Sequence, residues 1–237
     1  MSNQENKYPE IDRLKIVKGA KKTLVSPAGK TALDYLKNER KFSDEIIDQF
    51  DFGYCPINVD HELRGRIITP IYDQYYQLIA ISTRHLNKDH HSRFWHESFD
   101  KGSYLYGLYY AKDTIIKTGK AILVEGEFDV ASLHSFNFKM SIGVCGNAFT
   151  LSQVSLLARY CSLVYIMFDG DESGKKAIRR VLELYKKNNL EAYKIKYIPV
   201  YLPFNKDPDE YLRTEGRENF KNQLIKAKEE YDMGINI

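Results

Sequence analysis

The sequence predicts an α/β protein in which a mixed α+β N-terminal part precedes a parallel sheet and C-terminal helices. Beyond residue 120, short and continuous apolar runs alternate with helical stretches, which is typical of buried parallel strands. Before residue 120, the runs 67–72 and 77–82 are strand-like and are separated by a polar turn. With 237 residues, of which 43% are hydrophobic, the chain can form one large core or two small ones.

The N-terminal part begins with a polar, Lys-rich stretch, residues 1–25, which we expect to be a loose basic arm. Ser26 and Pro27 open a helical stretch, and Ser43 is a candidate cap for a second, short helix. The two strands follow, then an irregular polar and aromatic segment over 85–102. A helix is predicted over 104–116, and Gly119 marks its end.

The C-terminal part repeats a strand followed by a helix. Gly and polar residues separate the apolar runs, so each run is read as one strand. The predicted strands are 121–124, 141–144, 162–168 and 192–198, and the predicted helices are 128–137, 150–160, 173–188, 208–214 and 217–230. The expected divisions of the chain are 1–25, 26–118, 119–200 and 201–237.

Composition excludes several classes of protein. No apolar run is as long as a membrane span, and the first residues lack the apolar core of a signal peptide, so we expect a cytoplasmic protein without membrane partners. Cys55, Cys145 and Cys161 are isolated, with no Cys-x-x-Cys pair, so no zinc is expected. The net charge of +3 is too small to identify a partner.

Acidic clusters directly follow predicted strands. Glu125 and Asp129 follow the first, Asp169 and Asp171 follow the third, and the run 207–209 follows the fourth. The carboxyl ends of parallel strands meet at one edge of a sheet, where open α/β sheets bind ligands. Carboxylates that converge there repel one another unless a hard cation lies between them. The sequence therefore predicts a site for Mg²⁺ or Mn²⁺, and such sites commonly act on phosphates.

Each cluster also has a structural interpretation. Aspartates after strands are common turn residues and helix caps, and for Asp169 and Asp171 alone this interpretation is as good as the metal site. Three clusters after three strands are much harder to explain as coincidence. The histidines 85, 90, 91 and 96 could in principle bind a transition metal, but no carboxylate or cysteine at suitable spacing completes a ligand set. Arg84, Arg93 and the adjacent aromatics fit nucleic acid better.

The acidic motifs resemble a known family. The segments 122–130, 168–177 and 206–212 are similar to the TOPRIM domain of bacterial-type replicative DNA primases, and the Asp-Pro-Asp element at 207–209 favours primases over other TOPRIM proteins. Upstream, 64–73, 81–84, 93–98 and 101–108 resemble primase segments in family order. The departures are Ser82 and Thr83 in place of a glycine pair, Arg93 in place of lysine, and Gly146-Asn147 in place of Gly-Thr.

The resemblance implies a TOPRIM domain over 119–200, a basic α+β subdomain over 26–118 and a helical segment over 201–237. It implies a DNA primase, a nucleotidyltransferase that makes short RNA primers with Mg²⁺ and nucleoside triphosphates on single-stranded DNA. Glu125, Asp169 and Asp171 would be catalytic. The implied metal ligands are Glu125, Asp129, Asp169, Asp171, Asp207 and Asp209, and the implied nucleic-acid or nucleotide contacts are Arg64, Arg66, Arg84, Arg93, Lys101 and Lys175.

The zinc ribbon and helicase-docking domain of the family are not found in this sequence, which looks like the catalytic core. We therefore expect a replicative helicase or a zinc-ribbon partner to act in trans, as in a phage or plasmid system in a host cytoplasm. Two alternatives stay open: a TOPRIM-type metal-dependent nuclease, and a non-catalytic nucleic-acid-binding accessory of a replication complex.

Overall fold

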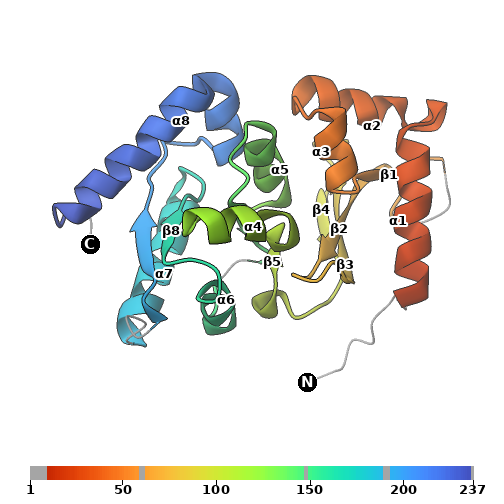
Figure 1. Ribbon diagram of the computed structural model, residues 1–237. Helices are drawn as coiled ribbons and strands as arrows, with labels where there is room; N and C mark the ends of the chain where they lie inside the picture. Colours follow the sequence, from red (N-terminus) through yellow and green to blue (C-terminus); the bar gives the residue numbers. More distant parts are fainter. Residues whose placement is uncertain (1–9, 59–61, 147–148, 189–192, 236–237) are drawn as a thin grey trace. The chain divides into compact units, whose positions relative to one another are not determined.

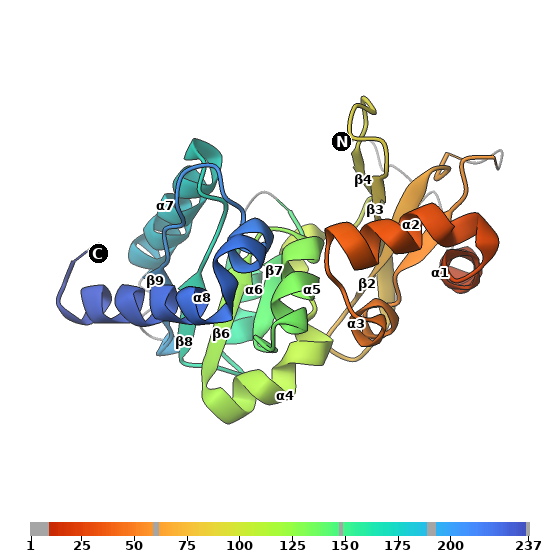
Figure 2. The same ribbon diagram turned by 90° about the horizontal axis from the view of Figure 1, so that it is seen from above.

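A computed structural model describes residues 10–58, 62–146, 149–188 and 193–235 (Figures 1 and 2). The chain divides into two compact units, one ending at Asp100 and the other beginning at Lys101. The predicted division at 118/119 lies further along the chain. No helix among the described residues combines the length and apolar character that crossing a membrane requires.

The first unit is built around a four-stranded antiparallel sheet in the order β1-β2-β3-β4. The predicted hairpin is confirmed, because β2 and β3 pair along their length with Thr69 opposite Ser82. Ser43 caps α3, its Oγ accepting a hydrogen bond from the Ile46 amide at 3.3 Å. The elements are α1 (Glu10–Leu24), η1 (Pro27–Gly29), α2 (Lys30–Asp34), η2 (Tyr35–Glu39), α3 (Asp44–Gln49), β1 (Gly53–Cys55), β2 (Arg66–Tyr72), β3 (Leu78–His85) and β4 (Phe94–His96).

Helix α1 corrects the prediction of a loose arm over 1–25, of which residues 1–9 lie outside the described part. Val17, Ala20 and Leu24 are buried at helical spacing, and Val17 and Ala20 pack with the sheet residues Ile68 and Ile81. Arg13 donates from Nε to both carboxylate oxygens of Glu97, at 2.9 and 3.0 Å, and both side chains are buried. The lysines hid this pattern, since they occupy the exposed side of the same helix.

The second unit has a five-stranded sheet in the order β5-β7-β6-β8-β9, with β7, β6, β8 and β9 parallel and β5 antiparallel at one edge. The predicted parallel sheet is confirmed. The elements are η3 (Lys101–Ser103), β5 (Leu105–Tyr106), α4 (Leu108–Thr118), β6 (Lys120–Val124), α5 (Glu127–Ser135), β7 (Ser141–Val144), α6 (Leu151–Leu157), β8 (Leu163–Ile166), α7 (Glu172–Lys187), β9 (Lys196–Pro199) and α8 (Pro208–Asp232).

Two predicted helices differ from those observed. The helix expected over 104–116 starts only at Leu108, because Gly107 has φ +77° and separates it from strand β5. The two helices expected at the C-terminus are the two parts of α8, which is interrupted at Gly216 with φ +81°. The predicted strand over 192–198 is observed as β9, and Ala192 lies outside the described residues.

Helices cover both faces of this sheet. Alternate strand residues such as Leu123, Ile142 and Ile166 face one core, which α4, α6 and α7 complete. Helices α5 and α8 pack against each other (Figures 1 and 2). Every residue of β7 and β8 is buried, which explains their continuous apolar sequences. The carboxyl ends of the strands therefore open into loops held between two helical layers.

Candidate active site

The acidic residues gather at the carboxyl ends of β6 and β8. These strands are neighbours, with Leu123 opposite Ile166, a strand order that the sequence analysis had not predicted. Glu125 follows β6 directly and Asp169 lies three residues beyond β8. One oxygen of Glu125, Oε1, accepts a hydrogen bond from the Asp169 amide at 3.2 Å. The two carboxylates are thus held side by side by the backbone.

Charge repulsion and burial act together at this pair. Burial, followed by the charges of Glu125, Asp207 and Asp171, raises the pKa of Asp169 to about 7. Burial is also the main reason that the pKa of Glu125 is raised, with Asp171 adding to it. Asp169 Oδ1 is buried and has no hydrogen-bond partner within the described structure. A bound cation or a proton would therefore stabilise the carboxylates of Glu125 and Asp169.

Two glycines, Gly170 and Gly174, allow close backbone contacts where β8 connects to α7. A Cβ at Gly174 would lie 2.0 Å from the Asp169 carbonyl oxygen, and one at Gly170 would lie 2.1 Å from the Pro203 carbonyl oxygen. Only glycine permits such close packing of backbone. Asp171 caps α7, its Oδ1 accepting from the Gly174 amide at 2.7 Å. The structural role that the sequence left open for Asp171 is thus present.

Asp129 joins the cluster from the first turn of α5. Its Oδ2 accepts from the Gly126 amide at 3.1 Å, and its Oδ1 accepts from the Asp209 amide at 3.4 Å. Burial, and next the charges of Asp207 and Asp169, raise the pKa of Asp129 well above its usual range. Asp129 thereby connects the start of α5 to the start of α8.

The Asp-Pro-Asp element begins α8. Asp207 is the N-cap, accepting from the Glu210 amide at 2.5 Å. Asp209 is fully buried and is bound by Arg213, with Nε to Oδ1 at 2.9 Å and Nη2 to Oδ2 at 3.1 Å. Of the predicted metal ligands, Asp209 is the one whose charge is already neutralised by a side chain. Nothing in the sequence motif had singled out Arg213 as its partner.

The carboxylates as they stand do not form a finished metal-binding shell. Among the described residues, no three acidic, histidine or cysteine side chains converge closely enough to hold an ion. The donor set is nevertheless all oxygen, which suits Mg²⁺ or Mn²⁺, and the unpartnered Oδ1 of Asp169 fits a cation. Residues 125, 169 and 171 are therefore the ones whose chemistry best fits such an ion.

The predicted basic contacts of the first unit have different environments. Arg66 is 5% exposed, and it donates to the carbonyl oxygens of Ser92 at 2.6 Å and Arg93 at 3.2 Å. It thus holds the connection between β3 and β4. Arg84 and Arg93 place their Cζ atoms 5.0 and 5.5 Å from the ring centroid of Phe94, which is 56% exposed. The structure leaves Arg64 exposed.

The two predicted lysine contacts belong to the second unit. Lys101 lies in η3, and its stem packs near Gly146, where an added Cβ would be 3.3 Å from Lys101 Cδ. Lys175, on the first turn of α7, pairs with Glu172 at 3.1 Å and lies over the Phe204 ring. Lys175 is therefore near the Asp169 loop in sequence but is already engaged by a neighbouring carboxylate.

The histidines form a stack rather than a ligand shell. The rings of His85 and His90 are 4.0 Å apart, and those of His90 and His91 are 4.5 Å apart. Nδ1 of His85 accepts from the Asn87 amide at 3.0 Å, and Nδ1 of His90 accepts from the Ser92 amide at 3.2 Å. These lone pairs are committed to the backbone, which gives the histidines a structural role in the β3–β4 connection.

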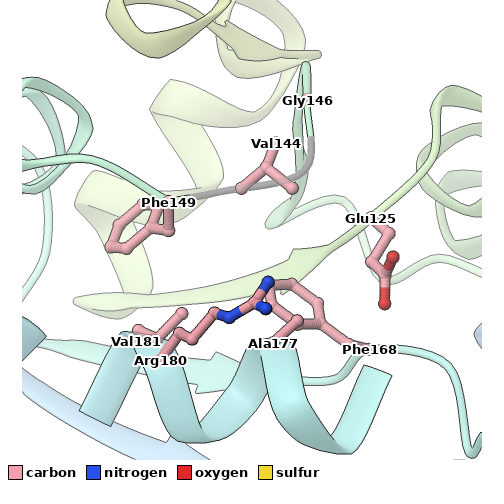
Figure 3. Close-up of a pocket in the computed structure, with 8 residues that line it drawn as sticks. All are labelled: Glu125, Val144, Gly146, Phe149, Phe168, Ala177, Arg180 and Val181. Carbon is pink, nitrogen blue, oxygen red and sulfur yellow. The ribbon is translucent and has the colours of Figure 1, made fainter. Parts of the chain in front are cut away.

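A recess adjoins Glu125 that the sequence motifs did not reveal. It has about 350 Å³ of empty space, open to solvent, and lies between the ends of β7 and β8 and helix α7 (Figure 3). Its lining residues are Glu125, Val144, Gly146, Phe149, Phe168, Ala177, Arg180 and Val181. Arg180 belongs to a basic helical stretch, and nothing in the pattern distinguishes it from the neighbouring Arg179.

Comparison with known proteins agrees with this architecture. Residues 122–212 match a family model described as Toprim-like. The chain is 28% identical to a DNA primase of Aquifex aeolicus, over 98% of this chain and 51% of the relative. It is 32% identical to a DNA primase of Chlamydia trachomatis, over 86% of this chain and 38% of the relative. The chain thus spans about half the length, or less, of these curated relatives.

Solved structures show the same likeness. A DNA primase domain from Pseudomonas aeruginosa matches with a TM-score of 0.81 and 27% identity, over 92% of this chain and 78% of that one. A DnaG primase catalytic domain bound to single-stranded DNA matches in fold with a TM-score of 0.81 and 24% identity, over 90% and 76%. The resemblance to the catalytic core of DnaG-type primases is therefore confirmed in sequence and fold, with a Toprim-like domain in the second unit.

Proposed function

We propose that this chain, which has the fold of a primase catalytic core, is a DNA-directed RNA polymerase that synthesises short primers on single-stranded DNA. The observation that carries the proposal is the pairing of Glu125 with Asp169 at the ends of adjacent parallel strands. The DNA primases that the chain resembles, and the solved primase domain bound to single-stranded DNA, support the substrate class.

The reaction joins two nucleotides. The 3′-oxygen of one nucleotide forms a bond to the α-phosphorus of the next, the bond from that phosphorus to the β-phosphate oxygen breaks, and pyrophosphate leaves. Glu125 is the proposed acceptor of the 3′-hydroxyl proton, because its carboxylate directly follows β6 and is held against the Asp169 amide. A bound Mg²⁺ or Mn²⁺ would supply the positive charge that offsets the negative charge of the triphosphate.

Glu125, Asp169 and Asp171 are the residues that we propose as ligands, and Asp129, Asp207 and Asp209 are proposed to complete or support the set. Asp209 acts through its ion pair with Arg213, which fixes the start of α8 beside Asp129. Template and triphosphate contacts are proposed for the predicted basic residues, namely Arg64, Arg66, Arg84, Arg93, Lys101 and Lys175. Arg66 would act indirectly, because its donors hold the backbone at Ser92 and Arg93.

We also propose that a replicative helicase or a zinc-ribbon module assists this core on DNA. The support is the resemblance alone, since these partners accompany the catalytic core in the family. Adding a candidate helicase or zinc ribbon should increase the yield of primers on long templates. An unchanged yield with each partner would contradict the proposal.

The deciding experiment is incubation of the chain with single-stranded DNA, the four ribonucleoside triphosphates and Mg²⁺. New RNA that depends on the template supports a primase. Shortened DNA would instead identify a Toprim-type nuclease. If neither product forms and calorimetry detects no Mg²⁺ binding, the chain is a non-catalytic accessory. Glu125→Gln is the matched variant, because it keeps the size of the side chain and removes the proton acceptor.

A further inference from the structure

The recess beside Glu125 contains an arginine that is aimed into it. Figure 3 shows the side chain of Arg180 reaching from α7 into the recess, toward the space between Phe149 and Glu125. Within the described structure, Arg180 has no hydrogen-bond or ion-pair partner. A guanidinium has five donors in a flat fork, so this one is available to a ligand.

The walls of the recess are apolar. Val144, Phe149, Phe168 and Val181 are each less than 9% exposed, and Ala177 lies beside Arg180 on the helix. Such walls suit a flat, largely apolar ring better than a phosphate group, which would lose hydration there without gaining enough donors. The recess is open to solvent, and its empty space of about 350 Å³ includes solvent at its mouth, so a planar ring can enter it from that side.

We infer that this recess binds the base of the nucleotide that starts the primer, with Arg180 reading it. The inference rests on the proposed function. The recess is next to Glu125, the proposed proton acceptor, so a nucleotide held there would present its 3′-hydroxyl to that carboxylate. An enzyme that begins a chain without a primer must hold its first nucleotide in this way.

The guanidinium of Arg180 should favour one base over the others. An arginine fork matches the O6 and N7 acceptors of guanine, and contact at these atoms is compatible with Watson–Crick pairing. The incoming nucleotide must accept any template base, so a fixed base-reading donor does not suit it. The recess is therefore a site for the first nucleotide, with guanine preferred, and it is not needed once a primer exists.

Binding is tested without catalysis. Guanosine 5′-monophosphate is added to the chain and to its variants, and amide resonances of Gly146 and Ala177 are followed by NMR. We expect saturable shifts in the wild type and in Arg179→Ala, a control at the neighbouring arginine, which does not line the recess. Arg180→Ala should weaken binding at least about tenfold. Ala177→Leu, which fills the recess, should weaken it independently. Equal binding by all four proteins, or equal binding of cytidine 5′-monophosphate, would overturn the inference.

Activity gives a second test that separates this inference from the proposed function. Dinucleotide synthesis from free nucleotides is compared with extension of an RNA primer already annealed to template. Arg180→Ala should raise the KM for the starting nucleotide about tenfold and leave extension within about twofold of wild type. Equal loss in both assays would show that Arg180 contacts something else and would reject the inference. If the wild type makes no RNA, the proposed function fails, and the NMR result alone decides the recess.

Discussion

Buried charged residues have opposite environments in the two units, as Arg66 on β2 and Asp169 after β8 show. Arg66 is buried with its donors satisfied by the carbonyl oxygens of Ser92 and Arg93. Asp169 is buried beside Glu125 with one oxygen unpartnered in the described structure, and its pKa is raised to about 7. A satisfied buried charge stabilises a fold, whereas an unsatisfied group of like charges costs stability. The contrast indicates that Arg66 has a structural role and that Asp169 is the better candidate for binding a cation.

The largest effect is expected when the negative charges of Asp169 and Asp171 are removed. Asp169→Asn with Asp171→Asn should lower primer synthesis on the order of 10³-fold or more, because the groups that attract a cation are gone. The fold should persist, since both replacements keep the size of the side chain and relieve repulsion. Primer synthesis is measured alongside circular dichroism. Glu172→Gln, at the first residue of α7, is the control and should stay close to wild type. Near-normal synthesis by the double variant would refute the site.

Replacing Arg66 should mainly lower the stability of the fold, in contrast to replacing Asp169 and Asp171. Arg66→Ala should lower the free energy of unfolding by roughly 2–3 kcal/mol, because it leaves the partly buried carbonyl oxygens of Ser92 and Arg93 without these donors. Urea denaturation measures this effect. Arg64→Ala, two residues away and exposed, is the matched control and should change stability by less than about 0.5 kcal/mol. A destabilisation as small as that of the control would remove the structural role of Arg66.

The buried imidazole of His134 provides a third case of a buried ionisable group, this time in helix α5. His134, on α5, is 2% exposed, and burial lowers its pKa to about 4 while its Nε2 contacts the Ser141 carbonyl oxygen at 3.0 Å. The unfolded chain therefore takes up the proton first as the pH falls. Stability that is present above the unfolded pKa near 6.5 is lost toward pH 4, by about 2 kcal/mol between pH 7 and pH 5.

This loss is isolated by comparing the wild type with His134→Gln. Urea denaturation at pH 7 and at pH 5 gives four free energies of unfolding, and the variant should lose about 2 kcal/mol less than the wild type over this range. Other titrating groups are common to both proteins and cancel in the difference. Equal losses would mean that His134 is not held neutral in the fold.

The smallest effect is expected at the arginines beside Phe94. Arg93→Ala should weaken binding of single-stranded DNA a few-fold and reduce its salt dependence by about one counterion, because it removes one phosphate contact. The stability of the fold should change little. Fluorescence anisotropy at several salt concentrations provides the measurement. A salt slope identical to that of the wild type would place the DNA contact elsewhere.

Local patterns predicted much of the fold. The apolar runs that became β6, β7 and β8 could be read directly, because a strand buried on both faces must be apolar throughout. Helix α1 could not be read in this way. Its stability depends on the sheet that packs on Val17 and Ala20 and on Glu97, which is 84 residues from Arg13.

The sequence by itself determined that acidic residues follow three of the four predicted parallel strands, and strand direction alone brings such residues to one edge of a sheet. Only the tertiary structure decided how each acid is used. Arg213 neutralises Asp209, backbone amides engage Asp171 and Asp207, and Asp169 keeps an unpartnered oxygen in the described structure. The physical reason is that burial and charge pairing depend on neighbours that folding supplies, and no residue carries that information alone. The recess at Arg180 likewise exists only once α7 packs beside β7 and β8.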